Sequence, residues 1–291
     1  MQIQPCGPLR GEITVPGDKS ISHRAVMLGA LANGTTHITG FLMGEDCLST
    51  IDCFRKMGVE INITDDEVIV EGVGLHGLEA PSEALYTGNS GTTTRLLCGI
   101  LAGQPFTVTM SGDPSIQKRP MGRVMKPLRE MGASIEGKND NFCPLTLFPS
   151  ELHGIEYRLP VASAQLKSAI LLAGLYAEGQ TTVIEPAPSR DHTERMFRAL
   201  GVEIETNGST ITLDPPEDLH AVDIAVPGDI SSAAFFLVAG AIVPGSELTI
   251  KNVGVNPTRT GVLDVLRDMG ADITESNFRD EAEPMCDLTI K

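Results

Sequence analysis

The sequence predicts an α/β protein that is built from copies of one strand–helix–strand–helix–strand–strand (βαβαββ) unit. Four segments of the 291-residue chain share a pattern, RKMGVEI, REMGASI, RALGVEI and RDMGADI, with glycines at intervals of 74, 69 and 69 residues. A basic amphipathic stretch precedes each glycine, and an alternating, β-branched stretch follows it. This order is typical of a helix that ends at glycine and leads into a strand. The glycines are Gly58, Gly132, Gly201 and Gly270.

A second feature recurs about 40 residues before each glycine. The four copies read VPGDKSISHRAVMLGALANG, YTGNSGTTTRLLCGILAGQ, LPVASAQLKSAILLAGLYAEG and VPGDISSAAFFLVAGAIVPG. Each copy runs into a helix that is apolar almost all round, which predicts burial at the centre of a domain. A repeat protein that serves only packing would show the same periodicity. The four helix starts, however, differ in ways that packing does not require.

Composition limits the classes of function. Hydrophobic residues make up 41% of the chain and charged residues 21%, which are ordinary globular values. The net charge of −16 argues against a nucleic acid or an anionic membrane as partner, because both need a basic surface. The six cysteines include no C-x-x-C pair and no histidine pair completes a zinc pattern, so no metal site is predicted. The absence of a signal-peptide pattern and of a long apolar run predicts a cytoplasmic protein with reduced thiols.

The first helix start combines several groups that bind anions. Gly17 allows a tight turn, and Lys19, Ser20 and Arg24 add charges and a hydroxyl near a helix N-terminus. A helix N-terminus itself carries unpaired N–H groups and a partial positive charge. The pattern therefore predicts a site for phosphate or carboxylate. The alternative is an ordinary serine cap beside two solvated cations.

The second and third helix starts are also richer than one cap requires. Asn89, Gly91 and Thr92 suggest backbone close to a small ligand, although a flexible polar loop has the same composition. Ser163 and Gln165 are able to hydrogen-bond a polar ligand at the third start.

Cations also precede the later helices. Arg119 lies in a Lys-Arg-Pro loop and Arg190 follows Ser189, whereas His192 is expected to be a solvated residue rather than a metal ligand. The fourth start, 228–232, has no cation near it in the sequence. In a strongly acidic chain, cations gathered at helix starts indicate one convergent anion site.

At this point the sequence resembles the 5-enolpyruvylshikimate-3-phosphate (EPSP) synthase family. The resemblance is carried by VPGDKSISHRA, GNSGTTTRLL, the Lys-Arg-Pro loop and PVASAQLKSA, in this order. It implies an enolpyruvyl transferase-type inside-out α/β barrel with six units, three in each of two domains. Four units are present here: 15–219 would form the first domain, and 1–14 with 220–291 an incomplete second domain.

The family transfers the enolpyruvyl group of phosphoenolpyruvate to the 5-hydroxyl of shikimate 3-phosphate and releases phosphate, without a metal or organic cofactor. By resemblance, Lys19 would contact both substrates and take part in catalysis. Ser20, Arg24, Ser163, Gln165 and Ser189 would hold shikimate 3-phosphate, with Gln165 also near phosphoenolpyruvate. Arg190 resembles a substrate-binding cation that some family members place at this point. Asn89, Gly91, Thr92 and Arg119 would hold phosphoenolpyruvate. Gly91 would also lie where the family meets glyphosate, so Gly91→Ala is expected to weaken binding of that inhibitor.

The sequence also departs from the family pattern. An aspartate of the fifth unit handles the substrate hydroxyl in the family, and Glu, Lys and Arg residues of the last units close over phosphoenolpyruvate. None has a counterpart in the four units, so this chain alone is expected to have little transferase activity. A non-catalytic lobe that binds shikimate 3-phosphate is one alternative. UDP-N-acetylglucosamine enolpyruvyl transferase is another, but it has a Lys-Asn pair where this chain has Lys19-Ser20, and a loop cysteine that is absent near Arg119. The resemblance further implies small-molecule partners only and a monomeric full-length form.

Overall fold

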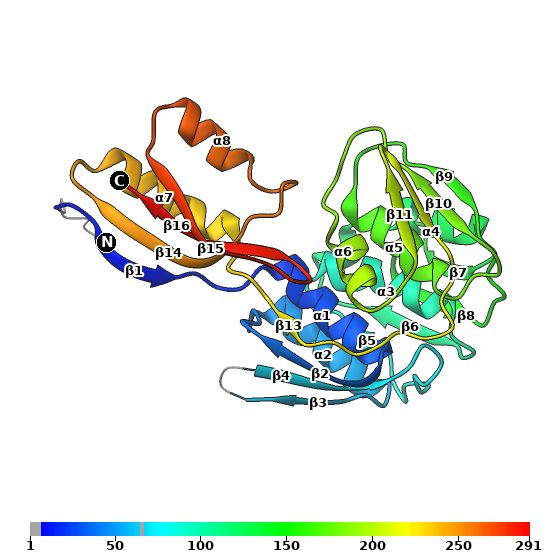
Figure 1. Cartoon of the computed structure of the whole chain (residues 1–291). Coiled ribbons are helices and arrows are strands. Elements are labelled where there is room, and N and C mark those ends of the chain that lie inside the picture. Colours follow the sequence, from blue (N-terminus) through cyan, green and yellow to red (C-terminus); the bar gives the residue numbers. More distant parts are fainter. Residues whose placement is uncertain (1–6, 65–66) are drawn as a thin grey trace.

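The computed structural model describes residues 7–64 and 67–291 and contains two lobes of unequal size (Figure 1). The larger lobe holds α1 to α6, and the smaller holds β1, β14 to β16, α7 and α8. Two hydrophobic clusters correspond to them: one contains core residues from Ile21 to Val226, and the other contains Val15 together with residues from Ile230 to Ile290.

The elements recur in the predicted order. A leading strand β1 (Arg10–Thr14) is followed by α1 (Lys19–Leu31), β2 (Asn33–Thr39), α2 (Glu45–Lys56), β3 (Glu60–Ile63) and β4 (Glu67–Val73). The second copy is β5 (Leu85–Tyr86), α3 (Gly91–Ala102), β6 (Val108–Ser111), a 3₁₀ turn at Ile116–Lys118, α4 (Gly122–Glu130), β7 (Ser134–Lys138) and β8 (Phe142–Phe148). The third is β9 (Glu156–Arg158), α5 (Ala164–Gly174), β10 (Thr181–Ile184), α6 (His192–Ala199), β11 (Ile204–Asn207) and β12 (Thr210–Leu213). The fourth is β13 (Ile224–Ala225), α7 (Ile230–Ile242), β14 (Glu247–Gly254), α8 (Gly261–Asp268), β15 (Ile273–Asp280) and β16 (Pro284–Ile290).

The four repeated glycines lie just beyond α2, α4, α6 and α8, as predicted. Their φ angles are 88°, 101°, 88° and 92°, a region in which a residue with a Cβ is strained. The arginine of the repeat has a structural role as well. In three copies its Nε donates to the carbonyl six residues later: Arg55 to Ile61 at 3.0 Å, Arg129 to Ile135 at 3.2 Å and Arg198 to Ile204 at 3.2 Å. This bond ties the end of the outer helix to the strand that follows.

Each copy contributes to a four-stranded sheet, but the leading strands of the first and fourth copies are exchanged. The sheets have the orders β13-β2-β4-β3, β5-β6-β8-β7, β9-β10-β12-β11 and β1-β14-β16-β15. β1 precedes α1 yet pairs in parallel with β14, while β13 precedes α7 yet pairs in parallel with β2. The segment 220–226, predicted to belong to the second domain, therefore joins the first sheet. That part of the predicted boundary is wrong because strand pairing, which the repeat pattern does not reveal, decides it.

The chain crosses between the lobes twice, at two VPGD sequences that lie side by side and antiparallel. Asp18 N donates to Pro227 O at 2.8 Å, and Asp229 N donates to Pro16 O at 2.9 Å. Glycine is required at Gly17, because a Cβ there would stand 2.0 Å from Gly40 O. The reciprocal bonds hold the two crossings in register.

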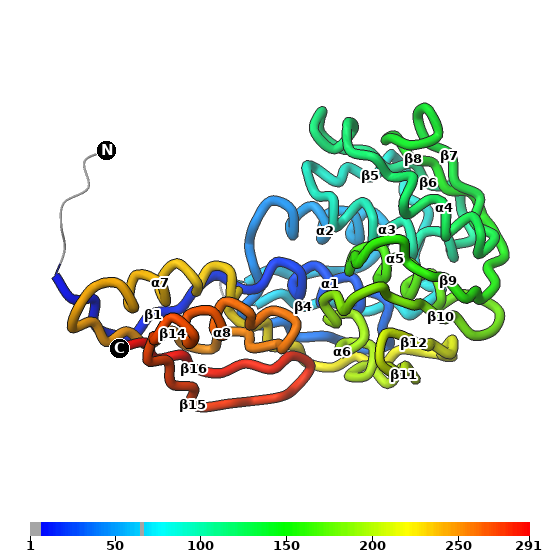
Figure 2. The backbone as a smooth tube through the Cα atoms, turned by 90° about the horizontal axis from the view of Figure 1, so that it is seen from above, coloured from blue at the N-terminus to red at the C-terminus, as the bar shows by residue number. Residues whose placement is uncertain are grey.

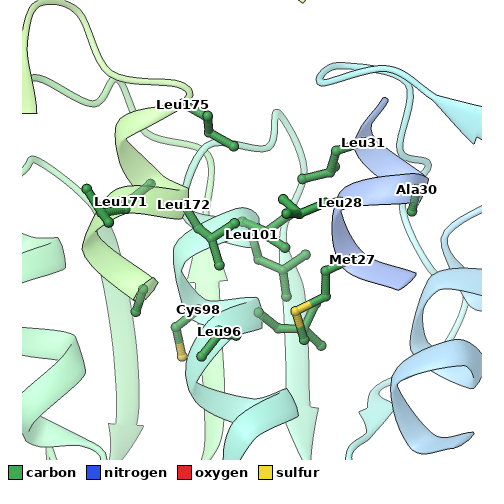
Figure 3. Close-up of a cluster of buried hydrophobic side chains, with 14 of the residues drawn as sticks. Met27, Leu28, Ala30, Leu31, Leu96, Cys98, Leu101, Leu171, Leu172 and Leu175 are labelled. Atoms are coloured by element: carbon green, nitrogen blue, oxygen red, sulfur yellow. The ribbon is translucent and has the colours of Figure 1, made fainter. Parts of the chain in front are cut away.

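The central helices α1, α3 and α5 are buried, as their apolar sequences predict. Figure 3 shows side chains of these three helices packed together, including Met27, Leu101 and Leu172. The same prediction is wrong for α7, which buries Ile230, Ala233, Leu237 and Gly240 on one face only. In the described part of the chain α7 packs on β14 and β16, and Phe235 and Ile242 on its outer side are 79% and 71% exposed. Figure 2 shows α7 along one edge of the smaller lobe.

We expect this apolar face of α7 to make the chain self-associate, since exposed patches of this kind lower their free energy by burial. Phe235→Ser should shift sedimentation-velocity profiles at high protein concentration toward the monomer. Ile63→Ser, at a residue 39% exposed in β3 of the other lobe, is the control and should leave the profile unchanged. A monomeric chain at all concentrations would contradict the expectation.

Candidate active site

A small cavity lies where the N-termini of α1, α3 and α5 meet the loop before α6. Its volume is about 200 Å³ and it is lined by Lys19, Ser20, Arg24, Thr92, Ala164, Gln165, Arg190 and His192. Six of the eleven residues proposed from the sequence as substrate contacts are in this set. A larger hollow of about 310 Å³ elsewhere is lined by Glu203, Asp214, Glu217 and Asp218, and its charge does not suit an anion.

The N-terminus of α1 supplies one wall of the cavity. Asp18 caps the helix, since its Oδ1 accepts from Ser20 N at 2.7 Å and from Ile21 N at 3.0 Å. Lys19 pairs with Asp46 of α2, and its side chain stays 47% exposed. A partly exposed ammonium beside a helix N-terminus remains able to turn toward an anionic ligand.

Arg24 is a fixed charge rather than a mobile one. Its Nε donates to Thr193 Oγ1 at 2.8 Å, its Nη2 to Ser168 Oγ at 2.7 Å and its Nη1 to Ser20 O at 2.9 Å. Burial lowers the pKa of Arg24 to about 10, although the nearby Glu194 carboxylate raises it. The guanidinium therefore stays charged at neutral pH and joins α1 to α5 and α6.

The cavity is also lined by α3 and α5, which hydrogen bonds join at this point. Gln165 Nε2 donates to Thr92 Oγ1 at 2.9 Å, and Arg95 Nη1 donates to Gln165 Oε1 at 2.9 Å. Arg95 was not selected from the sequence, although it lies in the GNSGTTTRLL motif.

Asn89, Gly91 and Arg119 lie together beside Thr92, outside the set that lines the cavity. Arg119 Nη2 donates to Asn89 Oδ1. A Cβ at Gly91 would stand 2.8 Å from Arg95 Nη1 and 3.2 Å from Arg119 Nη1. Two guanidinium groups thus lie close to the Gly91 backbone. Their positive charge suits an anionic group bound beside the cavity.

Two proposed contacts have structural partners instead of a place in the cavity wall. Ser163 caps α5, with its Oγ accepting from Leu166 N at 3.4 Å. Ser189 Oγ donates to Glu185. Substrate contact by these serines stays a prediction.

Two residues close to the site were misjudged or missed in the sequence. The expectation that His192 is solvated is wrong: the residue is 1% exposed and lines the cavity. The fourth helix start has no cation near it in sequence, but Arg259, 30 residues after Asp229, lies beside it in the structure. Arg259 Nη1 lies 3.0 Å from Asp18 Oδ2, and its Nη2 lies 3.0 Å from Asp229 Oδ1. Arg259 therefore joins the caps of α1 and α7 across the two crossings.

Neither a metal cluster nor a membrane span is found in the residues that the structure describes. Residues 7–64 and 67–291 contain no group of three or more His, Cys, Asp or Glu side chains placed to hold a metal ion. The same residues form no helix that is long and apolar enough to cross a membrane.

Comparison with known proteins agrees with this geometry. Residues 3–291 match the family model of EPSP synthase (3-phosphoshikimate 1-carboxyvinyltransferase). The 3-phosphoshikimate 1-carboxyvinyltransferase of Geobacillus thermodenitrificans is 62% identical over 97% of this chain and 66% of that protein. The Bacillus anthracis protein of the same name is 59% identical over 99% of this chain and 68% of its own length.

A solved structure, the EPSP synthase of Acinetobacter baumannii, superposes with a TM-score of 0.95 at 53% identity, over 99% of this chain and 66% of that one. This chain thus spans about two thirds of the length of the relatives it matches. From the motifs, the fold and these matches, we conclude that the chain belongs to the EPSP synthase family.

Proposed function

We propose that this chain binds shikimate 3-phosphate and phosphoenolpyruvate, and that it contributes to transfer of the enolpyruvyl group to the 5-hydroxyl with release of phosphate. One observation carries the proposal. In a chain of net charge −16, Lys19, Arg24 and Arg190 line one cavity at the meeting point of helix N-termini. Helix N-termini and clustered cations together favour phosphate groups.

The described residues would position the substrates and stabilise negative charge, which are large terms in catalysis. General acid–base groups typically add about 10²–10⁴-fold. The resemblance assigns those groups to units beyond the four in this sequence. We therefore expect binding of shikimate 3-phosphate by the 291-residue chain, with little release of phosphate when both substrates are present.

Titration calorimetry with shikimate 3-phosphate tests the proposal. Arg190 lines the cavity and donates from Nη1 to Ser20 Oγ at 3.4 Å. Arg190→Gln should lower the affinity about tenfold or more, as expected for a charge-assisted hydrogen bond.

The matched control is Arg267→Gln, which removes an exposed arginine paired with Glu275 in the other lobe. It should leave the affinity unchanged. Equal loss in both variants, or no binding by the unsubstituted chain, would refute the proposal. Normal turnover in a phosphate-release assay would contradict the expected lack of activity.

A further inference from the structure

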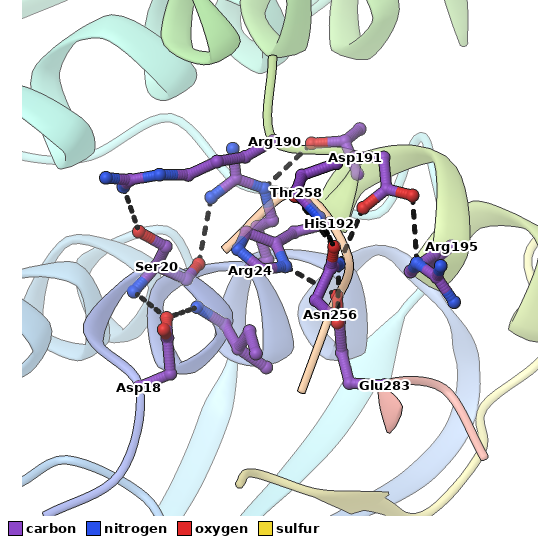
Figure 4. Close-up of polar contacts among 12 residues, drawn as sticks. Asp18, Ser20, Arg24, Arg190, Asp191, His192, Arg195, Asn256, Thr258 and Glu283 are labelled. Carbon is purple, nitrogen blue, oxygen red and sulfur yellow. Dashed lines mark hydrogen bonds and ion pairs between the residues drawn. The ribbon is translucent and has the colours of Figure 1, made fainter. Parts of the chain in front are cut away.

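His192 and Glu283 form a buried pair between the two lobes. His192 is the first residue of α6, and Glu283 lies in the turn between β15 and β16. Both side chains are 1% exposed, and His192 Nδ1 lies 2.7 Å from Glu283 Oε1 (Figure 4). Burial of a histidine and a carboxylate costs free energy, so a pair this well buried indicates a structural or functional role.

The surroundings fix the orientation of the ring. A carboxylate only accepts hydrogen bonds, so Nδ1 carries a hydrogen. Glu283 Oε2 accepts from Asn256 Nδ2 at 3.2 Å, and the same amide donates to Asp191 Oδ1 at 2.6 Å. Asp191 in turn accepts from Arg195 Nε at 2.9 Å. With Nδ1 committed to Glu283, the edge of the ring that remains for another partner is Nε2.

Within residues 7–64 and 67–291, no side chain or backbone group hydrogen-bonds to the buried His192 Nε2. An unsatisfied buried group of this kind costs about 1–3 kcal/mol, and most buried polar groups avoid the cost. His192 also lines the cavity that holds Lys19, Arg24 and Arg190. The missing partner of Nε2 is therefore expected on the cavity side.

We propose that His192 Nε2 is a contact for the phosphate group of a phosphate monoester bound in this cavity, with Glu283 as the residue that orients it. This inference rests on the proposed function and names a residue that neither the sequence motifs nor the resemblance assigned. A phosphate monoester dianion offers only acceptors, so in this contact His192 Nε2 is the donor. The ring is paired with the Glu283 carboxylate, and the cavity that it lines is also lined by the guanidiniums of Arg24 and Arg190. Since Glu283 belongs to the smaller lobe, the contact links the ligand to both lobes.

Two substitutions separate the two ring nitrogens. The amide of asparagine approximates Nδ1, so His192→Asn keeps a donor toward Glu283 and removes Nε2. The longer glutamine places its amide near the position of Nε2. Calorimetry of the 291-residue chain with shikimate 3-phosphate and with shikimate, which lacks the phosphate, compares the phosphate contact with the rest of the ligand.

We expect His192→Asn to lower the affinity for shikimate 3-phosphate about tenfold to hundredfold and to change the affinity for shikimate less than about twofold. His192→Gln should recover part of the loss, which a purely structural role would not produce. His37→Asn is the control, because His37 also faces a glutamate, at 4.0 Å from Glu67, but on the surface. It should bind both ligands normally.

Unchanged affinity for shikimate 3-phosphate in His192→Asn, or equal loss for both ligands, would overturn the inference. Should His192→Asn lose the circular dichroism spectrum of the unsubstituted chain, Glu283→Gln carries the same comparison, with selective loss in support and equal loss against. Failure of the unsubstituted chain to bind shikimate 3-phosphate would instead refute the proposed function. Inorganic phosphate then becomes the probe: weaker binding to His192→Asn supports the contact, and equal binding overturns it.

Discussion

Lys167→Met is expected to lower the free energy of unfolding by about 3–5 kcal/mol, because it leaves two buried carboxylates without their cation. Lys167 Nζ lies 2.9 Å from Glu185 Oε2 and 2.6 Å from Glu194 Oε1. The three side chains are 1%, 5% and 2% exposed, so water does not replace the lost charge. Urea unfolding followed by far-ultraviolet circular dichroism measures the effect.

A surface lysine with the same arrangement provides the control. Lys56 Nζ lies 3.3 Å from Asp52 Oδ2 and 3.0 Å from Glu83 Oε1, but these carboxylates are 55% and 67% exposed. Lys56→Met should cost less than about 1 kcal/mol. Similar losses in the two variants would show that burial of the Lys167 cluster is not what stabilises it.

The loss in Lys167→Met should also depend on pH. Burial raises the pKa of Glu194, and Lys167 partly offsets this by lowering it. Without Lys167 the pKa of Glu194 rises further, and a carboxyl with a raised pKa stabilises the fold when protonated and ceases to do so as pH rises through that pKa. The difference in stability between the unsubstituted chain and the variant should therefore be smaller near pH 5 than near pH 8. A difference that does not change with pH would exclude Glu194 as the group left unpaired.

The repeat itself could be predicted from the sequence because local chemistry sets it. Gly58, Gly132, Gly201 and Gly270 end helices since only glycine adopts their backbone conformation without strain. The exchange of β1 and β13 between sheets was predicted for one strand only. Both strands were assigned to the second domain, where β1 pairs with β14, but β13 pairs with β2 of the first. Both crossings have the sequence VPGD, and nothing local distinguishes a strand that pairs with its own unit from one that pairs with another.

The candidate site could be predicted as far as its residues lie at helix starts. Lys19, Arg24 and Gln165 are marked by the motifs, and the structure brings them to one cavity. His192 and Arg259 could not be assigned in this way, because their partners are far away in sequence. Glu283 is 91 residues from His192, and Asp18 is 241 residues from Arg259.

Gly99→Ala is expected to destabilise the larger lobe and weaken ligand binding together. Gly99 lies in α3 where α3 meets α5, and a Cβ there would stand 2.2 Å from Ala169 O and 3.1 Å from Leu172 Cβ. The nearest atom is backbone, so the helices must separate, and overpacking of this kind typically costs about 1–3 kcal/mol. The cost opposes the gain of about 1 kcal/mol that alanine usually brings inside a helix.

Separation of α3 from α5 should also change the geometry of the cavity. The hydrogen bonds of Gln165 with Thr92 and Arg95 span the same two helices at 2.9 Å, and a shift of a few tenths of an ångström weakens both. Affinity for shikimate 3-phosphate should fall in step with stability.

The control for Gly99→Ala is Gly261→Ala, the same substitution at the first residue of α8, where nothing lies within 4 Å of the added Cβ. It should leave the affinity unchanged and raise the free energy of unfolding by zero to about 1 kcal/mol. Gly99→Ala with unchanged stability and affinity would show that contact between α3 and α5 does not set the geometry of the site.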